Sequence, residues 1–117
     1  MTDRDPDCLF CKIVAGEIQS DRVYEDDDVI AFRDINPRAP THLLVIPRRH
    51  VADVQRLTDG DGELLARLFR AVRTLAAEAG LESGYRVVTN VGPDAGQTVF
   101  HLHLHLLGGR SMGWPPG

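Results

Sequence analysis

Residues 101–107 read His-Leu-His-Leu-His-Leu-Leu, a strict alternation between histidine and an apolar residue. Such alternation predicts a β-strand, because successive side chains of a strand point to opposite faces of its sheet. The leucines would then pack on a core, while His101, His103 and His105 line the other face over roughly 13 Å. Three histidines on one face of a strand indicate a chemical role, either in binding a metal ion or in phosphate chemistry.

The rest of the chain predicts a small α+β fold. The expected elements are, in chain order, a short helix over 9–14 that ends at Gly16, a β-hairpin of 23–25 and 29–32, a central strand over 41–46 that ends at Pro47, a long helix over 61–79, and a strand over 85–89. The long helix has one apolar stripe, formed by Leu64, Leu65, Leu68, Phe69, Val72, Leu75 and Ala76. This order favours an antiparallel sheet of about five strands with one long and one short helix. We expect a single domain over 1–117, with a flexible start at 1–7 and an irregular tail at 108–117.

Charge and hydropathy exclude several classes of partner. Seventeen acidic residues outnumber 13 basic ones, and the net charge of −4 does not favour a basic face that binds nucleic acid. No stretch approaches the ~20 apolar residues of a membrane span, and the polar first residues have no signal-peptide core. We therefore expect a cytoplasmic protein that binds neither nucleic acid nor membrane, with Cys8 and Cys11 reduced.

The loop before the histidine segment favours phosphate chemistry. Residues 92–98 offer backbone N–H groups, the Gln97 amide and the Thr98 hydroxyl, which can cradle a phosphate, although glycines also occur in plain turns. One neutral imidazole can attack phosphorus while a neighbouring group protonates the leaving nitrogen. The attacking ring must present a lone pair, so its other nitrogen must be a hydrogen-bond donor. His42, at the start of the central strand, is a candidate to position His103, or it is a hydrogen-bonded core histidine.

Several motifs together resemble one known family. Residues 101–107 match the H-φ-H-φ-H-φ-φ signature (φ apolar) of the histidine triad superfamily. Four further segments are similar to its histidine triad nucleotide-binding (Hint) branch, namely residues 32–37, 40–47, 96–101 and 107–117, the last of which ends in Trp-Pro-Pro-Gly. The resemblance runs from about Cys8 to the last residue, and it departs from the expected pattern at Thr98, where we expect serine.

The resemblance implies a homodimer in which the long helix and a central strand join two sheets. It also implies hydrolysis of purine nucleoside 5′-phosphoramidates and related aminoacyl-adenylates, with release of a nucleoside monophosphate such as AMP and without a catalytic metal. His103 would be the nucleophile that forms a nucleotidyl-histidine intermediate. The expected substrate-binding residues are Asp34 for the ribose, Phe10, Ile13, Phe32, Ile35 and Leu44 around the base, Asn90, Gly96, Gln97, Thr98 and His105 around the α-phosphate, and Trp114, which would close over the partner's site.

The two cysteines form a Cys-Leu-Phe-Cys motif, which is half of the ligand set of a structural zinc site. The usual second half, two closely spaced histidines, is absent, and nothing like the βαβ context of a redox motif surrounds the cysteines. Some histidine triad proteins complete such a site with two separate histidines. The resemblance therefore implies structural zinc on Cys8, Cys11, His50 and His101, which would leave His105 as the second catalytic imidazole.

Three other hypotheses stay open at this point. A dinucleoside polyphosphate hydrolase of the same superfamily would carry the same triad, although the tail resembles the Hint branch. A nucleotide-binding scaffold protein, with incidental catalysis, is a second alternative. A catalytic metal ion held by the three histidines is the third, because neutral imidazole is a common metal ligand.

Overall fold

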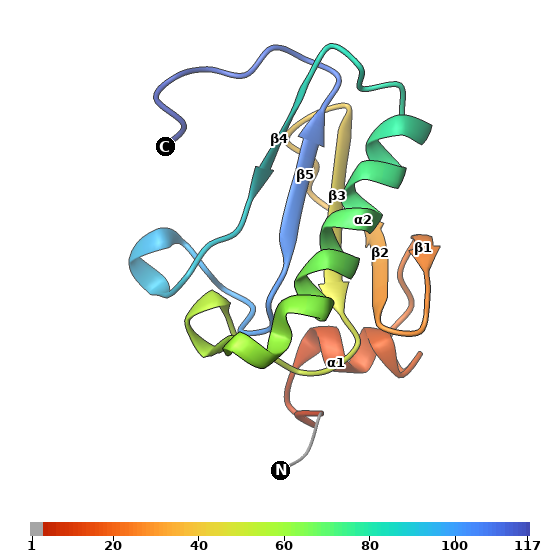
Figure 1. Cartoon of the computed structure of the whole chain (residues 1–117), viewed down its shortest axis with the longest axis vertical. Coiled ribbons are helices and arrows are strands. Elements are labelled where there is room, and N and C mark those ends of the chain that lie inside the picture. The colour runs from red at the N-terminus through yellow and green to blue at the C-terminus, as the bar shows by residue number, and fades with distance from the viewer. Residues whose placement is uncertain (1–3) are drawn as a thin grey trace.

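Figure 1 shows the computed structural model of the chain, which describes residues 4–117. The helices and strands are α1 (Leu9–Val14), β1 (Arg22–Glu25), β2 (Val29–Arg33), β3 (Thr41–Pro47), α2 (Gly62–Glu78), β4 (Tyr85–Val88) and β5 (Leu104–Gly108). Short 3₁₀ turns lie at Val54–Arg56, Asp59–Asp61 and Pro93–Ala95. Every helix and strand except β5 begins and ends within one residue of its predicted position, whereas the 3₁₀ turns were not predicted.

The strands form one antiparallel sheet in the order β1-β2-β3-β5-β4, which confirms the predicted α+β fold. The central strand β3 pairs with β2 on one side and with β5 on the other. Both of its edges are therefore used within the chain, and the expectation that it joins a partner's sheet is wrong. Within the described residues 4–117, only the outer strands, β1 and β4, have an edge that another strand can pair with.

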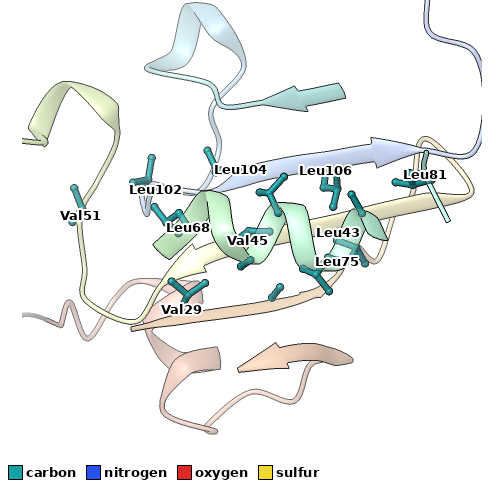
Figure 2. Close-up of a cluster of buried hydrophobic side chains, with 14 residues drawn as sticks. Val29, Leu43, Val45, Val51, Leu68, Leu75, Leu81, Leu102, Leu104 and Leu106 are labelled. Carbon is teal, nitrogen blue, oxygen red and sulfur yellow. The ribbon is translucent and has the colours of Figure 1, made fainter. Parts of the chain in front are cut away.

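The long helix α2 packs on one face of the sheet, and the main core lies between them (Figure 2). Leu68, Val72 and Leu75 of the helix are buried there together with leucines of β3 and β5. Phe69 differs from the predicted stripe, since 44% of it is exposed. It follows Leu68 by about 100° around the helix axis, which turns its ring away from the sheet.

The short helix α1 covers the opposite face of the sheet. Its buried residues Phe10 and Ile13 form a second cluster with Phe32 of β2 and Leu44 of β3. These strand residues alternate with the residues that face α2, as the period of two requires. The sheet therefore separates the main core from a smaller cluster that includes the two cysteines.

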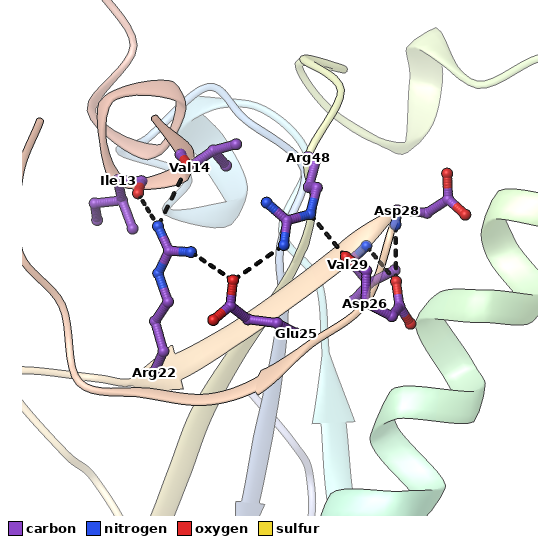
Figure 3. A network of polar contacts seen from close by, with 8 residues as sticks. All are labelled: Ile13, Val14, Arg22, Glu25, Asp26, Asp28, Val29 and Arg48. Carbon is purple, nitrogen blue, oxygen red and sulfur yellow. Dashed lines mark hydrogen bonds and ion pairs between the residues drawn. The ribbon is translucent and has the colours of Figure 1, made fainter. Parts of the chain in front are cut away.

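An arginine–carboxylate network connects α1 to the sheet (Figure 3). Arg22 of β1 donates to the carbonyl groups of Ile13 and Val14, at the C-terminal end of α1, and pairs with Glu25 at 2.9 Å. Arg48, which follows β3, donates to the same carboxylate at 3.1 Å. A guanidinium at a helix C-terminus satisfies carbonyl groups that have no partner within the helix. The network thus holds the helix that carries the cysteines.

Strand β5 begins at Leu104, three residues later than the alternation predicts. Upstream of it, the N–H of Leu102 donates to the carbonyl of Val51, in the loop after β3, at 2.6 Å. This bond to a loop holds the stretch before β5 outside the sheet ladder. The predicted division of faces is nevertheless confirmed, because Leu102, Leu104 and Leu106 all lie in the main core.

The segments at the two ends have different structures. Residues 1–3 of the expected flexible start lie outside the described residues, whereas residues 5–8 make a turn with a hydrogen bond from the Cys8 N–H to the Asp5 carbonyl at 3.1 Å. Residues 109–117 contain neither helix nor strand. Within residues 4–117, no helix is both long and apolar enough to cross a membrane.

Candidate functional site

His103 is buried between α1 and the sheet, with its ring edge-on to that of Phe10 at a centroid distance of 5.1 Å. Its Nδ1–H donates to the carbonyl of His101 at 2.7 Å, because a carbonyl can only accept. In the neutral ring, Nε2 then carries the lone pair. Burial lowers the pKa of His103 below its ordinary value, which favours the neutral ring at pH 7. His103 is thus in the state in which an imidazole is a nucleophile.

A chain of hydrogen bonds sets the tautomers of His42 and His105. The backbone N–H of Arg38 donates to His42 Nδ1 at 3.0 Å, so the neutral His42 ring carries its proton on Nε2. This Nε2–H donates to His105 Nδ1 at 2.9 Å, and His105 therefore carries its own proton on Nε2. Burial lowers the pKa of His42, and it lowers the pKa of His105 to about 4. His105 is thus a neutral hydrogen-bond donor, and its ring centroid lies 5.0 Å from that of His103.

The placement of His42 corrects the sequence-based interpretation, in which this residue positions His103. In the ladder between β3 and β5, Leu44 lies opposite His105 and His42 lies opposite Leu107. The rings of His42 and His105 are therefore diagonal neighbours on one face, whereas His103 precedes the strand. His42 orients His105 instead.

Asp34 lies beside this pair of histidines. Its Oδ2 is 3.4 Å from His42 Nε2, and its Oδ1 accepts from the Asn36 N–H at 2.8 Å, which closes a local turn. The carboxylate favours protonation of His42, but the cost of burying a charged ring outweighs it. Asp34 is therefore held near the histidines without an ion pair, and its side chain remains partly exposed.

Gln97 does not take the role that the sequence suggests for it. Its Oε1 accepts from the Gly92 N–H at 2.8 Å, and its Nε2 donates to the carbonyl groups of Ala52 and Val99 at 2.9 and 3.1 Å. Both amide protons are used, so the side chain is not free to donate to a phosphate. It braces the loop, while the Thr98 side of the loop is exposed.

The remaining predicted substrate-binding residues fall into two groups. Four apolar ones, Phe10, Ile13, Phe32 and Leu44, lie together in the cluster that also contains the cysteines. The others lie nearer the surface: Asn90 is half-buried, Gly96 is exposed, Ile35 is 91% exposed and Trp114 is 84% exposed.

A separate cluster is formed by Cys8, Cys11, His50 and His101, whose candidate ligand atoms all lie within 4.8 Å of one another. His101 Nδ1 is 3.3 Å from Cys8 Sγ and 3.6 Å from Cys11 Sγ. His50 Nδ1 is 3.3 Å from Cys11 Sγ. A tetrahedral zinc ion, with bonds of about 2.3 Å to sulfur and 2.0 Å to nitrogen, separates N and S ligands by roughly 3.5 Å. The four donors therefore have the spacing of a structural zinc site.

The surroundings of this cluster also fit a metal ion. His101 Nε2–H donates to the Pro47 carbonyl at 2.8 Å, which leaves the Nδ1 lone pair directed at the sulfur atoms. The backbone N–H groups of Asp5 and Cys11 donate to Cys11 Sγ and Cys8 Sγ, at 3.4 and 3.3 Å. Burial raises the pKa of the Cys8 thiol to about 11, so a nearby cation is needed to make it a thiolate.

The three histidines of the alternating segment do not converge on one point. His101 belongs to the cysteine cluster, His105 groups with Asp34 and His42, and His103 belongs to neither group. This geometry does not fit the hypothesis of one catalytic ion held by all three.

Sequence reasoning missed the backbone groups that set the tautomers of the site. They are the carbonyl groups of His101 and Pro47 and the N–H of Arg38. Every residue type except proline offers both groups, so side-chain identity carries no signal for them. The one available clue is the rule that a ligating or nucleophilic histidine needs a partner for its second nitrogen.

The fold and the site together define a class of protein: an α+β domain with a buried, neutral histidine next to a cysteine–histidine cluster. The family model described as "HIT domain" matches residues 15–112, and the chain belongs to this family, which confirms the resemblance found in its sequence. It is 49% identical over 115 residues to the 14 kDa zinc-binding protein of Zea mays, covering 97% of this chain and 90% of that protein.

Solved structures show the same fold. The crystal structure of a HIT family hydrolase from Legionella pneumophila Philadelphia 1 has a TM-score of 0.93 and 55% identity, covering 95% of this chain and 100% of that one. A histidine triad nucleotide-binding protein from Candida albicans has a TM-score of 0.79 and 35% identity, covering 92% of this chain and 82% of that one.

Proposed function

We propose that this protein hydrolyses purine nucleoside 5′-phosphoramidates and related aminoacyl-adenylates, with His103 as the nucleophile. The observation that carries this proposal is the hydrogen bond from His103 Nδ1 to the His101 carbonyl, which leaves the Nε2 lone pair free. The similar proteins support it, because one is named a hydrolase and another a nucleotide-binding protein.

In the proposed reaction, His103 Nε2 attacks the α-phosphorus and the P–N bond to the amine breaks. The ring of the nucleotidyl-histidine becomes positively charged, and its Nδ1–H remains bonded to the His101 carbonyl, which stabilises that charge. The departing nitrogen takes up a proton from solvent as it leaves as an amine. Water then attacks the phosphorus, the P–Nε2 bond breaks, and the nucleoside monophosphate is released from a neutral His103 ring. The attacking water gives up a proton to solvent, so that one water is consumed overall.

His105 and Asp34 have separate roles in this proposal. The neutral His105 ring, held by His42, donates its Nε2–H to a phosphoryl oxygen or to the leaving nitrogen. Asp34 accepts hydrogen bonds from the ribose hydroxyls, as its acceptor-only carboxylate allows. Backbone N–H groups near Gly96 and the Thr98 hydroxyl complete the donors around the phosphate. These donors are largely neutral, which suits one mononucleotide better than a polyanion.

We infer that Cys8, Cys11, His50 and His101 hold a structural zinc ion. The N–S spacings of 3.3–3.6 Å support this assignment. The name of the maize relative supports it as well. The bound ion would cross-link α1 to the loop after β3 and to the segment before β5, and so stabilise the cluster around the nucleophile.

We also infer that two copies of the chain associate through β4 and α2. Strand β4 is an outer strand of the sheet, and its Tyr85 is 41% exposed. On α2, Phe69 is 44% exposed. An unpaired strand edge and exposed aromatic rings each favour association with another copy of the chain. The exposed Trp114 would then be available to the partner's site. A Phe69→Glu variant should sediment as a smaller species than the unchanged protein, and equal masses would contradict this interface.

The proposed activity is tested by incubating the protein with adenosine 5′-phosphoramidate and measuring AMP. We expect steady AMP release that the His103→Ala variant abolishes, while a Thr98→Ser variant remains active because it keeps the hydroxyl. Faster cleavage of diadenosine triphosphate than of the phosphoramidate would favour the dinucleoside polyphosphate hydrolase instead. Tight AMP binding with negligible turnover of every amidate would favour a nucleotide-binding scaffold.

A further inference from the structure

His101 takes part in two structures at once. Its ring belongs to the cysteine–histidine cluster, where Nδ1 faces the sulfur atoms of Cys8 and Cys11 at 3.3 and 3.6 Å. Its Nε2–H is bonded to the Pro47 carbonyl at 2.8 Å, and the residue is fully buried, with 0% exposure. Its own carbonyl accepts the Nδ1–H of His103 at 2.7 Å. One residue therefore connects the candidate metal ligands to the candidate nucleophile.

The backbone around His101 has little other support. Regular strand pairing begins only at Leu104, so the carbonyl of residue 101 is not part of the sheet ladder. Outside the helices and strands, one backbone hydrogen bond within the described part of the chain holds residues 101–103, from the Leu102 N–H to the Val51 carbonyl. The direction of the His101 carbonyl consequently depends on how firmly the His101 ring is anchored.

We propose that His101 is a positioning residue for the nucleophile, and that the cysteine–histidine cluster controls how well it acts. With its ring held in the cluster, His101 keeps its carbonyl where it fixes both the tautomer and the orientation of His103. The structural metal site would thus set the catalytic rate without contacting the substrate. The expected change in kcat rests on the proposed function. The expected change in the tautomer and orientation of the His103 ring does not depend on any reaction.

If the cysteine–histidine cluster no longer holds the His101 ring, both the tautomer of His103 and kcat should change. If the His101 carbonyl moves, His103 loses the acceptor that holds the proton on Nδ1, and the ring also samples the tautomer in which Nε2 is protonated and cannot attack. A hydrogen bond of this kind changes an equilibrium by about 2- to 13-fold, so kcat should fall by a factor in that range. KM should change little, because substrate binding does not use the Nε2 lone pair.

The experiment compares the zinc-loaded protein, the same protein stripped by a chelator, and the His50→Ala variant. His50 is a useful site because it belongs to the cysteine–histidine cluster, with Nδ1 3.3 Å from Cys11 Sγ and its ring edge-on to that of His101, so its removal loosens the cluster around His101. Metal content is measured for each sample, the ¹⁵N signals of the His103 ring report its tautomer, and AMP release gives kcat and KM. Leu75→Ala is the control, because Leu75 lies in the main core on the other face of the sheet. It lowers stability without touching the cluster.

We expect the metal-depleted samples to show mixed tautomers at His103 and a kcat about 2- to 13-fold lower, both restored when zinc is added back to the stripped protein. Leu75→Ala should keep its zinc, the Nδ1–H tautomer and the original kcat at temperatures where it is folded. An unchanged His103 spectrum in a folded, metal-free sample would overturn the inference. If the zinc-loaded protein hydrolyses no amidate, the proposed function fails, and the ¹⁵N spectra still decide the positioning role.

Discussion

Replacement of His42 by phenylalanine tests the hydrogen-bond chain that orients His105. The variant keeps a ring of similar size but removes the acceptor of the Arg38 N–H, at 3.0 Å, and the donor to His105 Nδ1, at 2.9 Å. Each bond contributes about 0.5–1.5 kcal/mol, so the free energy of unfolding should fall by about 1–3 kcal/mol. At about 4 °C per kcal/mol for a domain of this size, Tm should decrease by roughly 4–12 °C.

The same variant should be slower as well as less stable. Without His42, His105 is no longer held in the tautomer that donates from Nε2, and we expect kcat to fall by about 2- to 13-fold, the equivalent of one such hydrogen bond. AMP release at saturating substrate, measured well below the Tm of the variant, gives this value.

Leu68→Ala is the matched control for the loss of stability. It should destabilise the main core by about 2–5 kcal/mol and leave kcat unchanged. An unchanged kcat in His42→Phe, despite a lowered Tm, would refute the reasoning. A loss as complete as that of His103→Ala would show instead that His42 acts directly in the reaction.

Three further predictions concern other parts of the site. Because burial lowers the pKa of His103 below its ordinary value, the decline of kcat/KM at low pH should have its midpoint at a lower pH than that of a free imidazole, about 6.5; a midpoint above this pH counts against a neutral nucleophile in a buried site. Gln97→Ala removes the three hydrogen bonds that brace its loop, so KM should rise more than kcat falls, and steady-state kinetics with an unchanged KM would contradict the bracing role. At Gly109, φ is +89° and a Cβ atom would lie 2.9 Å from Pro40, so Gly109→Ala should lower the free energy of unfolding by about 1–3 kcal/mol in a urea titration. Gly113→Ala, where nothing lies within 4 Å, is its control, and equal effects of the two substitutions would contradict the argument.

Sequence patterns were sufficient for most of the fold because each element has a local signal. The apolar period of α2, the turn between β1 and β2, and the leucine alternation before β5 all depend on neighbouring residues. Phe69 was placed wrongly because an apolar residue at the border of a helical stripe can face either the core or the surface. The start of β5 was misplaced because the N–H of Leu102 is bonded to Val51, a residue about fifty positions earlier.

The candidate site was predictable as a set of residues but not as a set of contacts. The resemblance suggested the grouping of Cys8, Cys11, His50 and His101, and the structure brings them together. It could not show that His42 bonds to His105, since this depends on the register between β3 and β5. Nor could it show which nitrogen of each imidazole is protonated, because backbone groups decide this and nearly every residue offers them, whether close to the histidine in sequence, like the Arg38 N–H beside His42, or distant, like the Pro47 carbonyl beside His101.

The central claim is that His103 forms a covalent bond to the nucleotide. The most direct measurement is to quench the protein during turnover of adenosine 5′-phosphoramidate and to map the modified peptide by mass spectrometry. Our account predicts one AMP group per modified chain, attached to Nε2 of His103 and absent from the His103→Ala variant. An AMP group attached to His105 or to any other residue, or one that still forms in the His103→Ala variant, would contradict it.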